Sequence, residues 1–186
     1  MGSRDFSAEN GLTLLFRGSY AFRLRLRGLF YSFFFKSRAN GLTVGPGIIL
    51  VNSKGISLGD NIHIGRFARM ESYDNVKNRE SKVRIGAGCN FGDLFHISAC
   101  NSIVIGKNCL FASKVMVIDF GHGRASDSKL REIAPQNRPK FSKSGITIGN
   151  NVWVGEGVTI YAGAHVPDGA VIPANSFVDG SFNKYV

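Results

Sequence analysis

The chain has 186 residues, of which 44% are hydrophobic, and this is enough apolar material for one folded domain with a core. A net charge of +10 favours anionic partners such as nucleic acid, anionic lipid or a phosphorylated small molecule, and charge alone does not choose among them. Three cysteines without a CxxC pair argue against a disulfide framework or a zinc ribbon and favour a reduced, cytoplasmic setting. The sequence also lacks the features of a secretory signal and of a membrane-spanning stretch.

Residues 1–43 are the first predicted unit, a basic and aromatic segment that we expect to be helical. It includes LTLLFRGSYAFRLRLRGLFYSFFFKSR, and residues 1–40 carry seven Arg or Lys against two acidic residues. One interpretation is a cap whose apolar side covers the open end of the following domain. The other is a helix on a membrane surface, with aromatic side chains in the lipid and arginines at anionic headgroups. The protein would then be peripheral at the inner face of the cytoplasmic membrane.

From Ile48 onward the sequence repeats every six residues. The clearest block has an aliphatic residue at six successive positions, which are Ile148, Val154, Ile160, Val166, Ile172 and Val178. Four residues after each of the first five comes a small or β-branched residue, and these are Val152, Val158, Ala164, Ala170 and Ser176. Phase slips separate three shorter blocks with the same period, namely Leu58, Ile64 and Met70, then Ile85, Phe91 and Ile97, then Ile105, Phe111 and Val117.

A period of six matches neither the 3.6 residues per turn of a helix nor the simple alternation of a strand. It fits a solenoid in which each unit is one short parallel strand and a corner, with the aliphatic residue pointing inward. Gly or Asn beside the corner, as at Gly106 and Asn150, tolerates a left-handed backbone. Stacked coils then bury a column of Val and Ile that no single repeat could bury. Cys89 and Cys109 fall in the small-residue position, so we expect them to pack in the core.

This periodicity resembles the hexapeptide-repeat family, whose members form left-handed parallel β-helices with three hexapeptides per coil. The resemblance covers residues 44–182. It implies an all-β fold in which residues 44–186 form a left-handed parallel β-helix after the N-terminal helical segment. The left hand follows only from the resemblance, because crossovers between parallel strands are usually right-handed.

Two segments, IVIGKNCLFASKVMVIDFGHG and ITIGNNVWVGEGVTIYAGAHV, resemble the sugar O-acetyltransferases of bacterial surface-polysaccharide clusters and the maltose and galactoside acetyltransferases. In those enzymes a coil ends in a His-containing turn and a polar loop leaves the helix, so we expect a loop excursion at residues 123–145. The resemblance implies an acetyl-CoA-dependent O-acetyltransferase acting on a saccharide hydroxyl, and a homotrimer with CoA between neighbouring subunits. Those enzymes also carry a GNPA-like motif past the last coil, and this chain stops at Val186 without one. Either the chain is truncated or its cofactor pocket is closed differently.

His122, in DFGHG, is the predicted general base. It lies where the repeat breaks and the loop begins, which is a common place for functional residues, and it matches the catalytic His of the resembling enzymes. A hydroxyl attacks a thioester well only as its proton is removed, and imidazole titrates near the working pH. We expect Asp119 to orient the imidazole, with Asp127 and Glu132 as alternatives. The competing interpretation of Asp119 is a turn residue that bonds the backbone.

The predicted cofactor contacts follow the coil after the loop. A corner of small residues permits close approach by a pantetheine arm, and its members are Ala162, Gly163 and Ala164. Trp153 comes directly before the inward Val154, so we expect it to point outward. A single exposed Trp is a place where a ligand or an adjacent subunit is expected to bind.

Two residues are predicted to contact the acceptor. Asn90 resembles an Asn in the acceptor pocket of the sugar acetyltransferases, although a plain corner Asn is the alternative. His96 would line a groove near the acceptor. His63 and His165 precede inward aliphatic residues and are expected to be solvated.

Other functions are weaker fits to the sequence. An N-acetyltransferase of an amino sugar or nucleotide sugar would use the same base and cosubstrate and is the main alternative. A γ-class carbonic anhydrase would need a closely spaced pair of zinc-binding histidines, which this sequence lacks, so no metal site is predicted. A non-enzymatic scaffold that serves only for assembly or binding would not need an interruption of its coils. Nucleic-acid binding rests on net charge alone.

Overall fold

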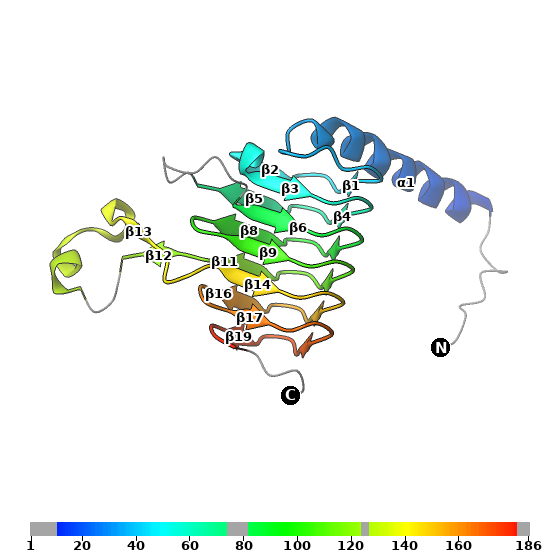
Figure 1. The fold of residues 1–186 in the computed structure, drawn as a ribbon. Coiled ribbons are helices and arrows are strands. Elements are labelled where there is room, and N and C mark those ends of the chain that lie inside the picture. The colour runs from blue at the N-terminus through cyan, green and yellow to red at the C-terminus, as the bar shows by residue number, and fades with distance from the viewer. Residues whose placement is uncertain (1–10, 74–81, 124–126, 182–186) are drawn as a thin grey trace.

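The structure is a computed structural model, and it describes residues 11–73, 82–123 and 127–181, with side chains from residue 18 onward. Most of the chain winds into a stack of coils with three flat faces, and one helix lies across the first coil (Figure 1). The fold is a left-handed parallel β-helix, as the resemblance to the hexapeptide-repeat family implied. All pairings within the three faces are parallel, and each strand pairs with strands one coil away.

Every coil contributes one strand to each face. Face 1 contains β1 (Thr43–Val44), β4 (His63–Ile64), β7 (Asn90–Phe91), β10 (Leu110–Phe111), β15 (Trp153–Val154) and β18 (Val171–Ile172). Face 2 contains β2 (Ile49–Val51), β5 (Arg69–Ser72), β8 (His96–Ala99), β11 (Met116–Ile118), β16 (Thr159–Tyr161) and β19 (Phe177–Val178). Face 3 contains β3 (Ile56–Leu58), β6 (Val83–Ile85), β9 (Ile103–Ile105), β14 (Ile146–Ile148) and β17 (His165–Val166). A short 3-10 helix, η1 (Ser53–Gly55), precedes β3.

The core consists of aligned columns, one behind each face. Behind face 1 the column runs through Val44, Ile64, Phe91, Phe111, Val154 and Ile172, all fully buried. The inward positions predicted from the six-residue period are all buried. Cys89 and Cys109 are also buried, and each thiol lies within hydrogen-bond distance of a backbone carbonyl of the next coil. The prediction of core cysteines is confirmed.

The corners explain the Gly and Asn content. Asn61, Asn108 and Asn151 have φ near +56° in equivalent corners, a conformation that Asn tolerates better than most residues, and Gly88, with φ +74°, occupies the corner between Asn61 and Asn108. Coils also approach closely there, since a Cβ built on Gly106 would lie 2.5 Å from the carbonyl oxygen of Gly149. The corner residues therefore set the spacing of the stack.

The N-terminal segment contains α1 (Gly11–Ser32), which packs by one side against the first coil and extends past it (Figure 1). Leu24 and Gly28 on the helix and Phe35 after it are buried. The opposite side of this segment is exposed and rich in aromatic and aliphatic residues, which are Tyr20, Phe22, Leu26, Leu29, Phe30, Phe33 and Phe34. No helix in the described ranges is both long enough and apolar enough to cross a bilayer.

Candidate active site

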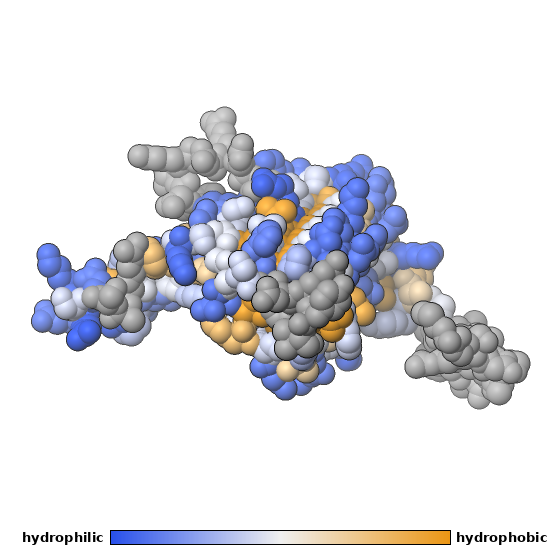
Figure 2. Space-filling model, turned by 60° about the horizontal axis from the view of Figure 1, so that its bottom comes forward, coloured by the Kyte–Doolittle hydropathy of each residue, from blue (hydrophilic) through white to orange (hydrophobic). Residues whose placement is uncertain are grey.

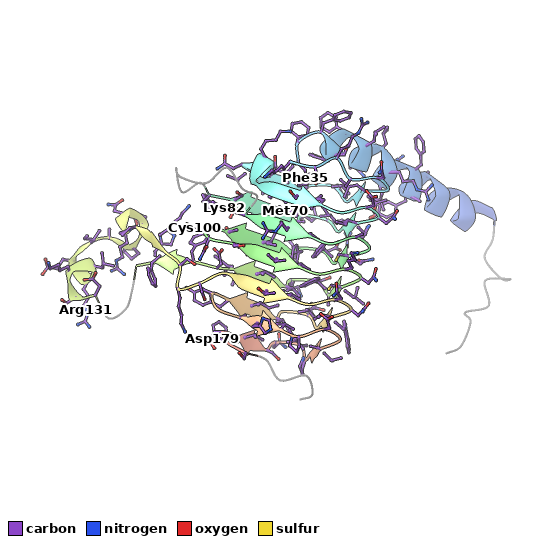
Figure 3. All side chains as sticks on the ribbon, in the orientation of Figure 1. Phe35, Met70, Lys82, Cys100, Arg131 and Asp179 are labelled. Atoms are coloured by element: carbon purple, nitrogen blue, oxygen red, sulfur yellow. The ribbon has the colours of Figure 1, made fainter. Side chains whose placement is uncertain are left out.

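An arm at residues 121–145 leaves the coils at the corner between faces 2 and 3. The arm leaves after β11 through β12 (Gly121–His122), contains two short 3-10 helices, η2 (Ser128–Glu132) and η3 (Pro135–Asn137), and returns through β13 (Lys140–Phe141). It projects away from the stack (Figure 1), and its surface is mostly hydrophilic (Figure 2). In Figure 3, Arg131 marks the outer part of the arm, and Lys82 and Cys100 mark the corner from which it leaves.

His122 lies at the base of this arm. β12 pairs antiparallel with β13, so that His122 is opposite Lys140. The imidazole is exposed, with its ring centroid 6.4 Å from that of Phe120. A Cβ built on the preceding Gly121 would lie 2.6 Å from the hydroxyl of Tyr161, so the backbone leading to His122 passes directly over this hydroxyl. The base predicted from the sequence is thus accessible beside a phenol.

Asp119 is fully buried and bonds the neighbouring coil. Its two carboxylate oxygens accept hydrogen bonds from the backbone N–H groups of Cys100 at 2.7 Å and Asn101 at 2.9 Å. Burial raises the pKa of Asp119, and the backbone N–H groups only partly oppose this shift. The expected hydrogen bond from His122 to Asp119 is not found among the described contacts. The carboxylate of Asp119 is bonded to the corner of the neighbouring coil, 18 and 19 residues earlier in the chain, and not to its own turn.

The two alternative carboxylates also lie apart from the imidazole. Asp127 caps η2, where its side chain accepts a hydrogen bond from the N–H of Lys129 at 3.1 Å. Glu132 is exposed at the end of the same short helix. Within the described part of the chain, no carboxylate therefore hydrogen-bonds to His122.

The predicted pantetheine corner lies one coil below the arm. Ala162 and Ala164 are buried, and the N–H of Gly163 donates to the carbonyl oxygen of Gly145 at 3.1 Å. A Cβ on Gly163, whose φ is +94°, would lie 3.1 Å from the hydroxyl oxygen of Ser144. The structure therefore places this corner in direct contact with the returning end of the arm.

Asn90 and Trp153 lie on face 1, away from the arm corner. They are both exposed and occupy one outward row, with Leu110 paired between them. His96 lies on face 2, where it is half-buried. Within a single chain, His122 therefore lies near the small-residue corner, whereas Asn90 and Trp153 lie on another face.

The remaining histidines differ from each other. His165 is exposed, as expected, but His63 is half-buried, and its Nδ1 lies 2.9 Å from the hydroxyl oxygen of Thr43. Burial lowers the pKa of His63, with Asp93 opposing the shift. No group of three potential metal ligands is found among the described residues.

Comparison with known proteins supports the repeat assignment. A family model described as the hexapeptide repeat of succinyl-transferase matches residues 145–179. The chain is 31% identical over 132 residues to the putative lipopolysaccharide biosynthesis O-acetyl transferase WbbJ of Escherichia coli (strain K12), covering 70% of this chain and 65% of WbbJ. The chain carries the hexapeptide repeat and is similar to acyltransferases that share it.

Two further proteins are similar to this chain. The galactoside O-acetyltransferase of Escherichia coli (strain K12) is 33% identical, over 66% of this chain and 46% of that protein. The polysialic acid O-acetyltransferase OatWY has a TM-score of 0.54 at 22% identity, covering 79% of this chain and 68% of that one. At this identity the structural match shows the fold alone. The chain spans only about half to two thirds of the length of the curated relatives it matches.

Sequence reasoning missed two charged residues beside the arm corner. The ammonium group of Lys140 lies over the ring of Tyr73, 2.8 Å from its centroid, and 5.2 Å from the centroid of Phe120. Burial lowers the pKa of Lys140. The second residue is Glu71 in β5, which is 3% exposed and bonds to His96, Ser98 and Arg69.

Proposed function

We propose that this chain is an acetyl-CoA-dependent O-acetyltransferase that modifies a hydroxyl of a surface polysaccharide, a glycolipid or a related saccharide. The observation that carries the proposal is the arm itself, which interrupts a regular coil and presents an exposed His122 beside a corner of small residues. Two relatives named as O-acetyltransferases, WbbJ and galactoside O-acetyltransferase, support the reaction class.

The proposed reaction is a direct transfer. The imidazole of His122 takes the proton of the acceptor hydroxyl as its oxygen attacks the thioester carbonyl carbon. The tetrahedral intermediate then collapses, the bond from carbon to sulfur breaks, and the CoA thiolate takes the proton from His122. The products are the acetyl ester and free CoA, and no acyl-enzyme is formed. Tyr161, beside the backbone of β12, is available to hydrogen-bond within the same site.

Acetyl-CoA would lie against the corner of Ala162, Gly163 and Ala164. The side chains of this corner are small, so they leave room for a pantetheine chain to lie close to the backbone. Trp153 is 52% exposed and could stack on a ligand only if a second subunit brings it near an arm. CoA bound to AntD, an N-acyltransferase from Bacillus cereus with the same fold, supports this type of ligand.

We further propose a homotrimer as the active assembly. The arm projects into solvent from its own chain, and Asn90 and Trp153 lie on a different face from His122. A neighbouring subunit would cover the arm and bring a second face to the site. Light scattering should give three times the 20.2 kDa chain mass. Full activity at the mass of a single chain would contradict this assembly.

We also propose that α1 holds the enzyme at the surface of the cytoplasmic membrane. Residues 10–59 contain no Asp or Glu, and Arg23 and Arg25 lie among the exposed aromatic residues of the helix. Each basic residue near an anionic surface contributes about 1 kcal/mol, and salt screens this attraction. Self-association through the same surface would bring like charges together, so an anionic bilayer is the better match.

Sedimentation with vesicles tests the membrane proposal. The protein should pellet with phosphatidylserine-containing vesicles at low salt, and high salt or neutral phosphatidylcholine vesicles should release it. Replacing Arg23 and Arg25 by Gln should weaken the binding, whereas the same change at the exposed Lys107 and Lys143 should not. Binding that depends neither on the salt concentration nor on the lipid charge would contradict the proposal.

Purified protein, acetyl-CoA and a panel of sugars, followed by thiol release, test the transfer itself. His122→Ala should lower turnover by about 10² to 10⁴ because a positioned base is lost, while the fold and acetyl-CoA binding remain. His165→Ala is the matched control, since His165 is equally exposed on face 3. Near-native turnover of His122→Ala would remove His122 from the mechanism.

A further inference from the structure

Glu71 is a buried carboxylate whose three partners meet on face 2. Its Oε1 accepts a hydrogen bond from Nε of Arg69 at 2.6 Å, and its Oε2 accepts one from the hydroxyl of Ser98 at 3.0 Å. Nε2 of His96 lies 3.3 Å from the same Oε2. Glu71 thus joins an exposed guanidinium group, a buried hydroxyl and a half-buried imidazole. The proposed transfer by His122 does not use this group.

The coil itself does not need a carboxylate at this position. Glu71 belongs to an outward row of face 2 in which paired positions run from Val51 through Glu71 and Ser98 to Ile118. Two of these positions are aliphatic, so an apolar side chain fits the row. Replacing a buried ion pair by apolar residues is often neutral or stabilising. The packing of this row therefore does not require a carboxylate.

The hydrogen bond to Glu71 fixes which nitrogen of His96 remains available. Burial raises the pKa of Glu71, but the hydrogen bonds from Arg69, His96 and Ser98 outweigh it, so the pKa is lowered overall. An ionised carboxylate only accepts hydrogen bonds. Nε2 of His96 must therefore carry its hydrogen, and the lone pair of the neutral ring is on Nδ1. None of the described residues hydrogen-bonds to Nδ1.

This imidazole lies on the same side of the molecule as His122. The ring of Tyr73, which follows the strand of Glu71, is 5.6 Å from that of Phe120, and Phe120 packs against His122. The side chain of His96 is 30% exposed, which leaves it open to a ligand. The outward side of face 2 thus carries an oriented hydrogen-bond acceptor, and β11 of the same face leads into the arm that carries His122.

We propose that His96, held in place by Glu71, binds the acceptor saccharide by accepting a hydrogen bond at Nδ1 from a hydroxyl next to the one that is acetylated. Glu71 is then a positioning residue that acts through His96. This inference rests on the proposed acetyl transfer for its substrate class. The carboxylate-imidazole geometry stands without it.

Nuclear magnetic resonance of protein with ¹⁵N-labelled histidine tests the pair and its ligand directly. The Nε2 hydrogen of His96 should be visible because the carboxylate slows its exchange, and that of the exposed His165 should not. Glu71→Ala should remove the signal, whereas Glu71→Gln, which keeps an accepting oxygen, should retain it. A signal that persists in Glu71→Ala, or a hydrogen found on Nδ1, would overturn the pairing.

Titration with a panel of p-nitrophenyl glycosides then tests the acceptor role without requiring turnover. At least one glycoside should shift the Nδ1 resonance of His96 in the wild type, and this shift should be lost in Glu71→Ala. A shift without acetyl transfer would keep this inference and reject the proposed function. If no glycoside moves the resonance, His96 is not an acceptor-binding residue.

Steady-state kinetics with the glycoside that gives the fastest turnover separate binding from chemistry. His96→Ala and Glu71→Ala should each raise the acceptor KM by roughly tenfold, as expected for one lost hydrogen bond, with a smaller change in kcat and none in the KM for acetyl-CoA. Glu71→Gln should recover much of the loss, and His165→Ala should match the wild type. A fall of kcat by about 10² or more at unchanged KM would instead make His96 the base and overturn the assignment.

Discussion

Gly28 decides how α1 is attached to the first coil, and replacing it by Ala tests that attachment. A Cβ built at this position would lie 2.5 Å from the carbonyl carbon of Leu42 and 3.1 Å from the backbone nitrogen of Thr43. Both obstacles are backbone atoms of the strand region beneath the helix, so neither can rotate away. The helix would have to move outward to restore ordinary contact, also with the carbonyl oxygen of Leu42, and Leu24 and Phe35 would lose packing with it.

Two effects of opposite sign act in this variant. Ala is favoured over Gly inside a helix by about 1 kcal/mol, whereas overpacking of a fixed site costs about 1 to 3 kcal/mol. Gly18 provides the matched control, because it lies in the same helix with no atom within 4 Å of its added Cβ. The difference between Gly28→Ala and Gly18→Ala therefore isolates the packing cost, at about 1 to 3 kcal/mol in favour of the Gly18 variant.

Hydrogen exchange of α1 amides measures this difference locally. Gly18→Ala should slow exchange, and Gly28→Ala should quicken it relative to Gly18→Ala by about 5- to 150-fold, the equivalent of that free energy. Thermal unfolding should show a gap of about 2–4 °C for each kcal/mol if the helix unfolds together with the coils. Equal stabilisation by the two substitutions would refute the docking of α1 through Gly28.

Three further variants test the core and the charged groups. Phe91→Ala should cost about 3 to 5 kcal/mol of unfolding free energy in denaturant titration, since this fully buried ring packs 4.4 Å from Phe95 and 4.9 Å from Phe111 between centroids. The lowered pKa of Glu71 means that its ionised form contributes stability above its ordinary pKa of 4.5, and this contribution is lost as the pH falls below that value. The melting-temperature gap between wild type and Glu71→Gln should therefore shrink in acid, and a gap that grows there would contradict the sign. Asp119→Ala should cost roughly 1 to 3 kcal/mol by leaving two backbone N–H groups without their acceptor, and an unchanged melting temperature would show that those bonds contribute nothing.

The coils could be predicted from the sequence because the residues that specify each repeat lie within that repeat. Each repeat carries its own inward aliphatic residue and corner, so Ile148 and Val154 could be assigned without knowing any distant contact. The start of the arm was visible for the same reason, as the place where the period fails. The partners of Asp119 could not be read from the period alone, because Asn101 lies 18 residues earlier whereas the register of this coil is 20 residues, with Met116 opposite His96.

Glu71 could not be found in this way. It faces outward, where the repeat imposes no residue type, and its partner His96 lies 25 residues away, on strands that pair 27 residues apart. The additional residues between β5 and β6 shift the register, and only the folded coil reveals that Arg69 pairs with His96. The location of Asn90 and Trp153 on another face could not be predicted either. The sequence shows which residues point inward, but not which coil and which face lie next to the arm.

The arm interrupts the chain without interrupting the sheet. β14 pairs with β9 in the regular register, Ile146 opposite Ile103 and Ile148 opposite Ile105, as if the arm were absent. The penalty for such an excursion is mainly loop-closure entropy, which rises by only about 0.6 kcal/mol for each doubling of loop length. Evolution can therefore lengthen, shorten or exchange this insertion while the stack beneath it stays intact. Acceptor preference can diversify in related enzymes through one exchangeable cassette, and a protein engineer could graft arms between them at the same two junctions.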